Sequence, residues 1–393
     1  MTEWRKATLD EMGVVSRGKS KHRPRNDARL FGGKYPFIQT GDIGAAGLYV
    51  LDYSQTYNEV GLAQSKLWEK DTLCITIAAN IADTALLAFP ACFPDSIMGF
   101  QPYENVSNVK YVKYCFDILK KECQLISQGT AQDNLSWKKL STILFPCPPI
   151  EIQNKIAEVL SRYDALIENY QRQIKLLEEA AQRLYKEWFV DLRFPGHQST
   201  PIINNLPQSW HKKSVSMLGE YLNGFAFKPS DWQETGKPII KIKEMGNGVT
   251  AETPRNNGDR VPKKYLIKAG DLLFSWSATL MVIVWTGEEG WLNQHLFKVT
   301  PAEGIGREFL LQSIANAIAE FSNLTTGSTM KHIQRNKLDQ VFVNTPPPEI
   351  MEKYNNLAES IRTQIINKST QIRNLSEARD RLLPKLMSAE IEV

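Results

Sequence analysis

The stretch that decides the fold runs from Pro148 to Phe189 and reads PPIEIQNKIAEVLSRYDALIENYQRQIKLLEEAAQRLYKEWF. Apolar residues recur there in alternating steps of four and three, the pattern of a coiled-coil seam, at Ile152, Ile156, Val159, Tyr163, Leu166, Tyr170, Ile174, Leu177, Ala181, Leu184 and Trp188. One extra step of four, from Tyr170 to Ile174, is a stutter that relaxes the supercoil without ending the helix. About 38 helical residues make a rod of roughly 57 Å. Its single apolar stripe requires a partner.

The partner is predicted in the same chain, because the sequence repeats at a shift of 198 residues. The shift places Glu151-Ile152 on Glu349-Ile350 and Arg183-Leu184 on Arg381-Leu382. Upstream, it carries Lys139-Leu140 onto Lys337-Leu338 and Pro148-Pro149 onto Pro346-Pro347. The second copy has a more polar seam, at Gln364, Lys368 and Arg379, and Pro384 is expected to interrupt its last turns.

The repeat continues into the front of each half. At a shift of 206, Gly13 corresponds to Gly219 and Gly18 to Gly224. A repeat this long indicates a tandem duplication of a globular part, a proline turn and a long helix. The fold class predicted is α+β: two mixed α/β domains separated by two long antiparallel helices that form a coiled coil, with pseudo-twofold symmetry. The boundaries predicted are 1–147 for the first domain, 148–192 for the central helix, 193–345 for the second domain and 346–393 for the C-terminal helix.

Short β-branched and apolar segments indicate strands inside the domains, and longer periodic segments indicate helices. Strands are predicted at 36–40, 73–77, 85–89, 97–100, 239–243, 271–276 and 281–285. Helices are predicted at 109–125 and 307–324.

Composition excludes several classes of protein. No apolar run is long enough to cross a membrane, and the start MTEWRKATLDEM lacks the apolar core of a signal peptide, so we predict a cytoplasmic protein without membrane association. The five cysteines form no CxxC pair. They predict reduced thiols, not a zinc site or a disulfide framework. The net charge of +4 is mild, so the position of the charge matters more than its sum.

A basic segment between Gly18 and Lys34 holds one acid, Asp27, with Pro24 and two glycines blocking regular structure. Its bases are Lys19, Lys21, Arg23, Arg25, Arg29 and Lys34. We interpret it as a loop that contacts phosphates. A solvated charged surface is the alternative, because charge runs are common on surfaces.

Two motifs resemble catalytic sites and are rejected. Residues 13–20 match the phosphate-loop pattern GxxxxGK[ST], but that loop follows a buried strand and opens a helix, whereas Pro24 lies just downstream here. Asn344-Thr-Pro-Pro347 differs from the asparagine-proline-proline-aromatic motif of amino methyltransferases at two positions. The five histidines have no spacing typical of catalysis or metal binding. No enzyme and no metal site are predicted.

Over nearly its whole length, the chain resembles the specificity subunit of type I restriction-modification systems. The resemblance rests on the order and duplication of several short motifs. These are the two G-[ST]-x4-[LI]-x4-L segments at 129–140 and 327–338, the proline runs before Glu151 and Glu349, Leu184-Tyr-Lys-Glu-Trp-Phe-Val-Asp191, Leu206-Pro-Gln-Ser-Trp210 and Arg381-Leu-Leu-Pro-Lys-Leu-Met387. The second copy lacks the glutamine of the family's Pro-Pro-x-x-Glu-Gln signature, which the first copy has at Gln153.

The resemblance implies two target-recognition domains, each reading one half of a bipartite, asymmetric DNA site. It implies that the coiled coil fixes the spacer between the half-sites and docks two methylation subunits, and that restriction subunits join the complex. No cofactor is expected in this chain. S-adenosylmethionine is expected in the partner methylation subunit. Sites about one helical turn of DNA apart need two surfaces held by a rigid element, which agrees with a paired rod. A scaffold with two non-DNA domains is the competing interpretation.

Base edges are read by polar side chains and phosphates by basic ones, so we searched for such residues around the predicted strands. Besides the basic loop, the candidates in the first domain are Thr40, Thr76, Asn80, Ser96, Gln132 and Asn134. Those in the second domain are Lys243, Ser275, Ser277, His295, Lys331 and Arg335, with Trp276 as a stacking or packing partner. Ordinary satisfaction of buried polar groups is the alternative role for about half of them.

The outer faces of the rod are predicted to dock the methylation subunits, because apolar residues remain outside the seam at Leu160, Ile167 and Leu176. The aromatic set Tyr185, Trp188 and Phe189 lies at its far end. Packing on the adjacent domain is the alternative for these three.

Overall fold

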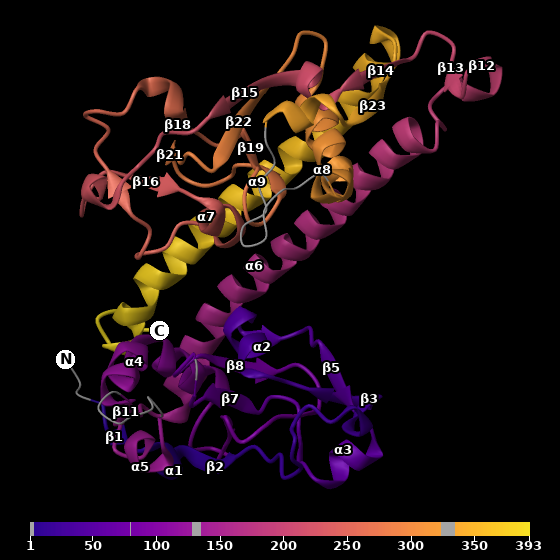
Figure 1. Cartoon of the computed structure of the whole chain (residues 1–393). Coiled ribbons are helices and arrows are strands. Elements are labelled where there is room, and N and C mark those ends of the chain that lie inside the picture. Colours follow the sequence, from indigo (N-terminus) through magenta and orange to yellow (C-terminus); the bar gives the residue numbers. More distant parts are fainter. Residues whose placement is uncertain (1–3, 79, 128–134, 324–334) are drawn as a thin grey trace. The chain divides into compact units, whose positions relative to one another are not determined.

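A computed structural model describes residues 4–78, 80–127, 135–323 and 335–393 (Figure 1). The chain divides into two compact units. Unit 1 is Met1–Asn169 with Ile372–Val393, and unit 2 is Tyr170–Gln371. Each unit therefore combines one globular domain with a part of each long helix, and each is described by itself.

The domain of unit 1 contains two main sheets, with strand orders β2-β10-β7-β8-β4 and β5-β3-β9-β6, and the pair β1-β11. Its strands are β1 (Lys6–Ala7), β2 (Gly13–Arg17), β3 (Phe31–Phe37), β4 (Tyr49–Val50), β5 (Gln55–Tyr57), β6 (Leu67–Trp68), β7 (Leu73–Thr76), β8 (Thr84–Leu87), β9 (Ala91–Cys92), β10 (Ile97–Pro102) and β11 (Phe145–Pro146). Its helices are α1 (Leu9–Met12), α2 (Thr40–Ala45), α3 (Glu59–Ala63), α4 (Val109–Ser127) and α5 (Trp137–Leu140).

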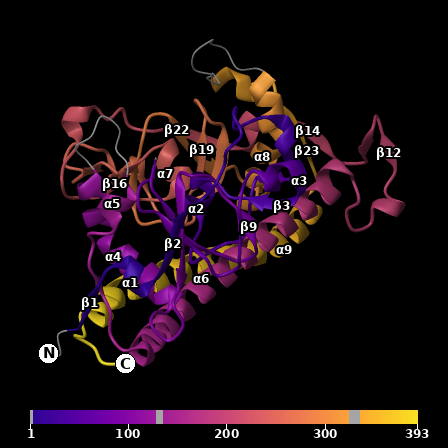
Figure 2. The same ribbon diagram turned by 90° about the horizontal axis from the view of Figure 1, so that it is seen from below.

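The first of these sheets is buried on both faces. Successive side chains of a strand point to opposite faces, and β7 sends Leu73 and Ile75 into a core that includes residues of α4, whereas Cys74 enters a second core with Trp68 and Phe93. The rings of Trp68 and Phe93 stack with their centroids 4.8 Å apart. Figure 2 shows unit 1 from below, with β2, α4 and the start of α6.

The domain of unit 2 has sheets of order β15-β22-β19-β20 and β17-β16-β21-β18, and the pairs β14-β23 and β12-β13. Its strands are β12 (Ile202–Ile203), β13 (Leu206–Pro207), β14 (His211–Ser214), β15 (Gly219–Asn223), β16 (Lys237–Ile240), β17 (Arg255–Asn256), β18 (Leu266–Ile267), β19 (Leu272–Ser275), β20 (Met281–Val284), β21 (Gly290–Leu292), β22 (Leu296–Pro301) and β23 (Phe342–Thr345). Its helices are α7 (Ile242–Asn247) and α8 (Arg307–Asn323).

The predicted duplication is confirmed element by element. The order β2-β10-β7-β8 matches β15-β22-β19-β20, and the parallel pair β3-β9 matches the parallel pair β16-β21. Gly18 and Gly224 occupy the same crowded place. A Cβ on Gly18 would lie 2.2 Å from the Pro94 carbonyl oxygen, and one on Gly224 would lie 2.1 Å from that of Asn293. Both repeats therefore need a residue without a side chain there.

The two long helices are α6 (Ile150–Tyr185, 36 residues) and α9 (Pro348–Met387, 40 residues). A π-helical turn, Lys186–Val190, extends α6. Their antiparallel pairing is visible inside each unit. In unit 1, Asp164 of α6 accepts a hydrogen bond from Arg379 of α9, and in unit 2 the Lys368 ammonium lies 5.3 Å from the ring centre of Tyr170. The expected interruption at Pro384 was wrong, because α9 continues to Met387.

The predicted seam is wrong in part of unit 1. Leu166 was placed in the seam but is 45% exposed, whereas Leu160 and Ile167, placed outside it, are 0% and 9% exposed. Leu160 joins the core that contains α4 residues and the end of α9. This part of α6 packs on its own domain as well as on α9, so its buried face is wider than a two-helix seam.

Three further expectations were corrected. Tyr185, Trp188 and Phe189 belong to the core of unit 2. They therefore pack on the adjacent domain, which was the alternative to a docking surface. Thr40 and Lys243, predicted at strand ends, lie in α2 and α7. Each helix begins where a carboxylate three residues beyond the cap, Asp42 or Glu244, accepts the cap's backbone N–H.

Of the five cysteines, all free thiols in this structure, four are buried. In the described part of the chain, no helix is long and apolar enough to cross a membrane, and the same residues contain no cluster of side chains suited to a metal ion.

Candidate nucleic-acid interface

The basic loop is held by two carboxylates, Asp27 within the loop and Asp95, which is 70 residues from Arg25 in the chain. Arg25 donates two hydrogen bonds to Asp95, at 2.6 and 2.9 Å, and Arg23 lies 3.9 Å from the same carboxylate. Arg29 and His22 both contact Asp27. Hydrogen bonds from the Arg29 side chain hold the pKa of Asp27 well below its ordinary value. The loop therefore has a defined internal network.

Two acids from outside the segment also contact its bases. Lys34 lies 3.3 Å from Glu59, so Glu59 and Asp95 also neutralise bases of the segment. Lys19 and Lys21 are exposed and have no ion-pair partner among the described residues. The side chains of Arg23, Arg25 and Arg29 stay 54%, 49% and 79% exposed. Positive charge remains accessible, although the arginines already have carboxylate partners.

Three candidate base-reading residues are buried, and the hydroxyls of two of them, Thr76 and Ser275, close turns instead. Thr76 ends β7 and is 0% exposed. Its hydroxyl donates to the carbonyl of Asn80 and accepts from the backbone N–H of Asp83 at 3.0 Å. Ser275 ends β19 in the second repeat, is also 0% exposed, and donates to the carbonyls of Ser277 and Thr279. Ser277 is 3% exposed. These groups have no free surface for a base, so they position the turns.

Exposed candidates lie beside these turns. Asn80 is exposed, and a Cβ on Gly44 of α2 would lie 3.0 Å from its amide nitrogen. Thr40, the first residue of α2, is partly exposed, so the β7-β8 turn and α2 meet at one edge of the first domain. Lys243 in α7 is exposed, with its ammonium 3.5 Å from Glu252.

The segments that directly precede β10 and β22 each hold one candidate base-reading residue, at equivalent positions of the two repeats. Ser96 and His295, which correspond at a shift of 199, are both partly exposed. The His295 ring lies 5.8 Å from that of Trp276, and the Trp276 indole donates to Asn223 at 3.2 Å. His295 and Trp276 are thus brought together, and Ser96 adjoins Asp95, the anchor of the basic loop.

Gln132, Asn134 and Lys331 lie outside the described residues. Arg335 is exposed at the start of the 3₁₀ turn Arg335–Asp339. The rejected catalytic motifs have structural roles. Residues 13–17 form strand β2, paired with β10, and the Asn344 amide donates to the Phe189 carbonyl at 3.0 Å.

Two contacts between a lysine and a tryptophan were not predicted from the sequence. The Lys241 ammonium lies 4.5 Å from the ring centre of Trp232, which is 48% exposed. The Lys66 ammonium lies 3.5 Å from the ring centre of Trp68. An exposed aromatic ring beside a cation suits nucleic-acid contact. A tryptophan with a lysine nine residues later is too common a pattern for the sequence to indicate this pair.

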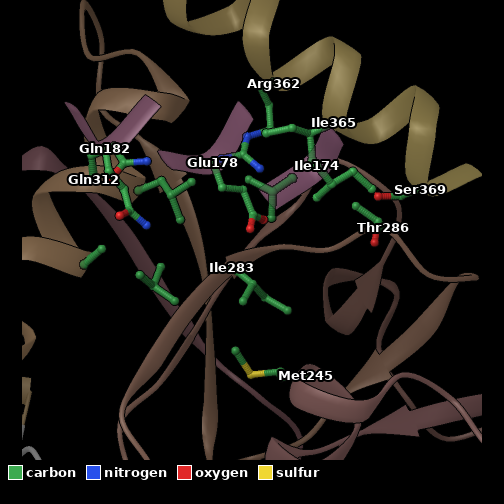
Figure 3. Close-up of a pocket in the computed structure, with 14 residues that line it drawn as sticks. Ile174, Glu178, Gln182, Met245, Ile283, Thr286, Gln312, Arg362, Ile365 and Ser369 are labelled. Atoms are coloured by element: carbon green, nitrogen blue, oxygen red, sulfur yellow. The ribbon is translucent and has the colours of Figure 1, made fainter. Parts of the chain in front are cut away.

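Unit 2 also has a pocket of about 360 Å³ at the long helices, lined by both apolar and polar side chains (Figure 3). Glu178, Gln312 and Arg362 lie on its wall. Arg362 donates two hydrogen bonds to Glu308, and Gln312 donates to the same carboxylate. Glu308, Gln312 and Arg362 satisfy one another where the domain attaches to the helices, so their role is structural.

A family model described as "Type I restriction modification DNA specificity domain" matches residues 1–179 and 207–371. The chain is similar to the type I restriction enzyme MjaIX specificity subunit of Methanocaldococcus jannaschii, with 24% identity covering 100% of this chain and 94% of that protein. It is 22% identical to the HindI specificity subunit of Haemophilus influenzae, over 100% of both chains. The crystal structure of the type I restriction-modification system S subunit from M. genitalium has a TM-score of 0.56 at 14% identity, covering 98% of this chain and 96% of that one. This last likeness concerns the fold.

Proposed function

The chain belongs to the family of type I restriction-modification DNA specificity subunits, and on that premise we propose that it is a non-catalytic subunit whose two domains each read one half of a bipartite, asymmetric DNA site. The observation that carries the proposal is that the family model covers both repeats. Each repeat forms its own domain, and the two differ in the residues around their β7-β8 and β19-β20 turns. Two different domains suit two different half-sites.

The exposed polar groups of each domain support a DNA-reading role for this surface. In the first domain, we propose that Lys19, Lys21, Arg23, Arg25 and Arg29 contact phosphates and that Asn80, with Thr40 and Ser96, faces bases. In the second, Lys243, Arg335, His295 and Trp276 take these roles. The buried Thr76, Ser275 and Ser277 support the reading turns from behind.

The long helices are proposed to fix the spacer between half-sites and to dock two methylation subunits, which restriction subunits join. Leu176 is 64% exposed on α6 and remains available for docking, whereas Leu160 and Ile167 are covered by the chain itself. We propose that this chain binds no cofactor and that the methylation subunits bind S-adenosylmethionine.

A domain exchange tests the proposal. Residues 1–145 are replaced by the first domain of another family member, and the protein is produced with its methylation subunits. Sequencing that detects methylated adenines then reports the recognised site. We expect one half-site to change while the other half-site stays the same. Retention of both original half-sites by an active chimera would refute the assignment of one domain to each half-site.

A further inference from the structure

The repeat gives each residue of α6 an equivalent on α9. Related helices can pair in more than one way unless something disfavours the alternatives. Two copies of this chain could pair α6 with α6, or α9 with α9. In such a homotypic pairing, between two copies of the same helix, each residue would face the repeat equivalent of its present partner. The equivalents used below are Asp164 with Arg362, Tyr170 with Lys368, Ala181 with Arg379, Tyr185 with Leu383, Trp188 with Leu386 and Phe189 with Met387.

The first half of the chain is the first domain with α6, and the second half is the second domain with α9. In unit 1, a buried carboxylate of the first half is neutralised by an arginine of the second half. Asp164, 7% exposed, accepts a hydrogen bond from Arg379 at 2.5 Å and another from the Tyr114 hydroxyl of α4. Burial and the neighbouring Asp164 raise the pKa of Tyr114, so this hydroxyl is a donor and brings no charge. Arg379 is therefore the cation that compensates Asp164.

In unit 2, the position equivalent to Asp164 holds an arginine, Arg362, whose hydrogen-bonded carboxylate lies in its own half. Arg362, 5% exposed, donates to Glu308 of α8 at 2.7 and 3.0 Å. α8 and α9 both belong to the second half, so the hydrogen-bonded carboxylate of Arg362 does not come from α6. Glu178 of α6 lines the same pocket, where burial raises its pKa and the Arg362 charge lowers it. The equivalent of Arg379 on α6 is Ala181, which has no charge. Figure 3 shows Arg362 of α9 and Glu178 of α6 on the wall of the pocket.

Homotypic pairing would disrupt this arrangement in both halves. An α6 pair would bring Ala181 to Asp164 and leave a buried carboxylate without its cation. An α9 pair would bring Arg379 to Arg362, whose carboxylate partner is already occupied. Removing one member of a buried ion pair is strongly destabilising, because the other charge stays desolvated. Lys368 lies on the ring of its own equivalent, Tyr170, so an α9 pair would also oppose two lysines.

The helix ends differ in shape. In unit 2, Tyr185, Trp188 and Phe189 of α6 enter the domain core. In unit 1, the equivalent Leu383, Leu386 and Met387 of α9 enter the other core. Exchanging them would overpack one core and leave a cavity in the other, and both changes are destabilising.

We propose that the two halves of this chain are mutually selective, so that the half with α6 pairs with the half with α9 and rejects a second copy of itself. Every assembly then holds one first domain and one second domain. An asymmetric DNA site requires this composition if the proposed function holds, but the selectivity does not depend on that function.

The test uses the intact chain with a protease site inserted between the exposed residues Gln198 and Ser199. The folded protein is cleaved, unfolded in urea and refolded, and native mass spectrometry then measures the composition of each assembly. We expect nearly all assemblies to contain one first half and one second half. Homotypic assemblies in the proportion of random pairing would overturn the proposal.

A double variant, Asp164→Asn with Arg379→Gln, removes both charges and keeps polar side chains at both positions. We expect the ratio of heterotypic to homotypic assemblies to fall by roughly tenfold or more, because no buried charge then opposes homotypic pairing. The matched control is Glu158→Gln with Arg162→Gln, an exposed ion pair on α6, which should leave the ratio unchanged. Equal effects of the two variants would overturn the role of Asp164 and Arg379.

If the cleaved chains do not refold, the halves are instead produced together in one cell, with the first half in two differently tagged forms. Capture through one tag should then recover the second half without the other tagged form. Recovery of both tagged first halves in one complex would overturn the proposal.

Discussion

Thr76 and Asn80 sit on the same turn with opposite exposure, and they separate a supporting role from a reading role. Thr76→Val removes a buried hydroxyl whose partners are the Asn80 carbonyl and the Asp83 N–H. We expect the free energy of unfolding to fall by about 1–3 kcal/mol, because these buried groups lose a partner, with no change in the sequence recognised. Asn80→Ala should leave stability nearly unchanged and alter recognition of the first half-site. Urea unfolding and methylation mapping measure the two effects, and the opposite assignment would contradict this division.

The arginines of the basic loop test phosphate contact. Changing Arg23, Arg25 and Arg29 together to Ala should weaken binding to all DNA sequences and flatten its dependence on salt, because fewer counterions are released. Binding titrations of the assembled complex at several salt concentrations measure the slope. Arg162→Ala on α6, an exposed arginine outside the loop, is the control. A triple variant with the parental slope would show that Asp27 and Asp95 keep these arginines from the DNA.

At the scale of the element, α6 is buried over a wider face than a coiled-coil seam requires. Leu160→Ala should lower the free energy of unfolding by about 2–5 kcal/mol, because it opens a cavity in the core of unit 1. The same change at Leu176, which is 64% exposed, should alter stability by less than about 0.5 kcal/mol. If Leu176 docks a methylation subunit, Leu176→Ala should nevertheless weaken that complex. Urea unfolding measures the stability, and size-exclusion chromatography with the methylation subunit measures the complex. Equal losses of stability in the two variants would contradict the burial of Leu160 and the exposure of Leu176.

At the scale of the whole molecule, the long helices are proposed to measure the spacer. One heptad inserted after Gln171 and one after Ser369 keep the repeat in register, since these positions correspond at the shift of 198. Both points lie within two residues of the boundaries between the compact units, so neither domain core is interrupted. The insertions lengthen the helices by about 10 Å, which should lengthen the spacer by roughly three base pairs. Methylation mapping reads the spacer directly, and an active variant with the original spacer would show that the helices do not measure DNA.

The sequence by itself determined the duplication, the two long helices and the family, because a repeat, a heptad period and ordered short motifs can be recognised along the chain without knowing which residues are in contact. Individual strands such as β7 and the long α4 and α8 were predictable for the same reason. Only the tertiary structure decided which face of α6 is buried, since Leu160 and Leu166 differ in their neighbours and not in their hydrophobicity. It also decided which candidates reach solvent. Thr76 and Asn80 are both polar, but the β7-β8 turn buries the Thr76 hydroxyl and leaves the Asn80 side chain exposed. The partners of Arg25 and Asp164 are 70 and 215 residues away in the chain, and folding alone brings such distant charges into contact.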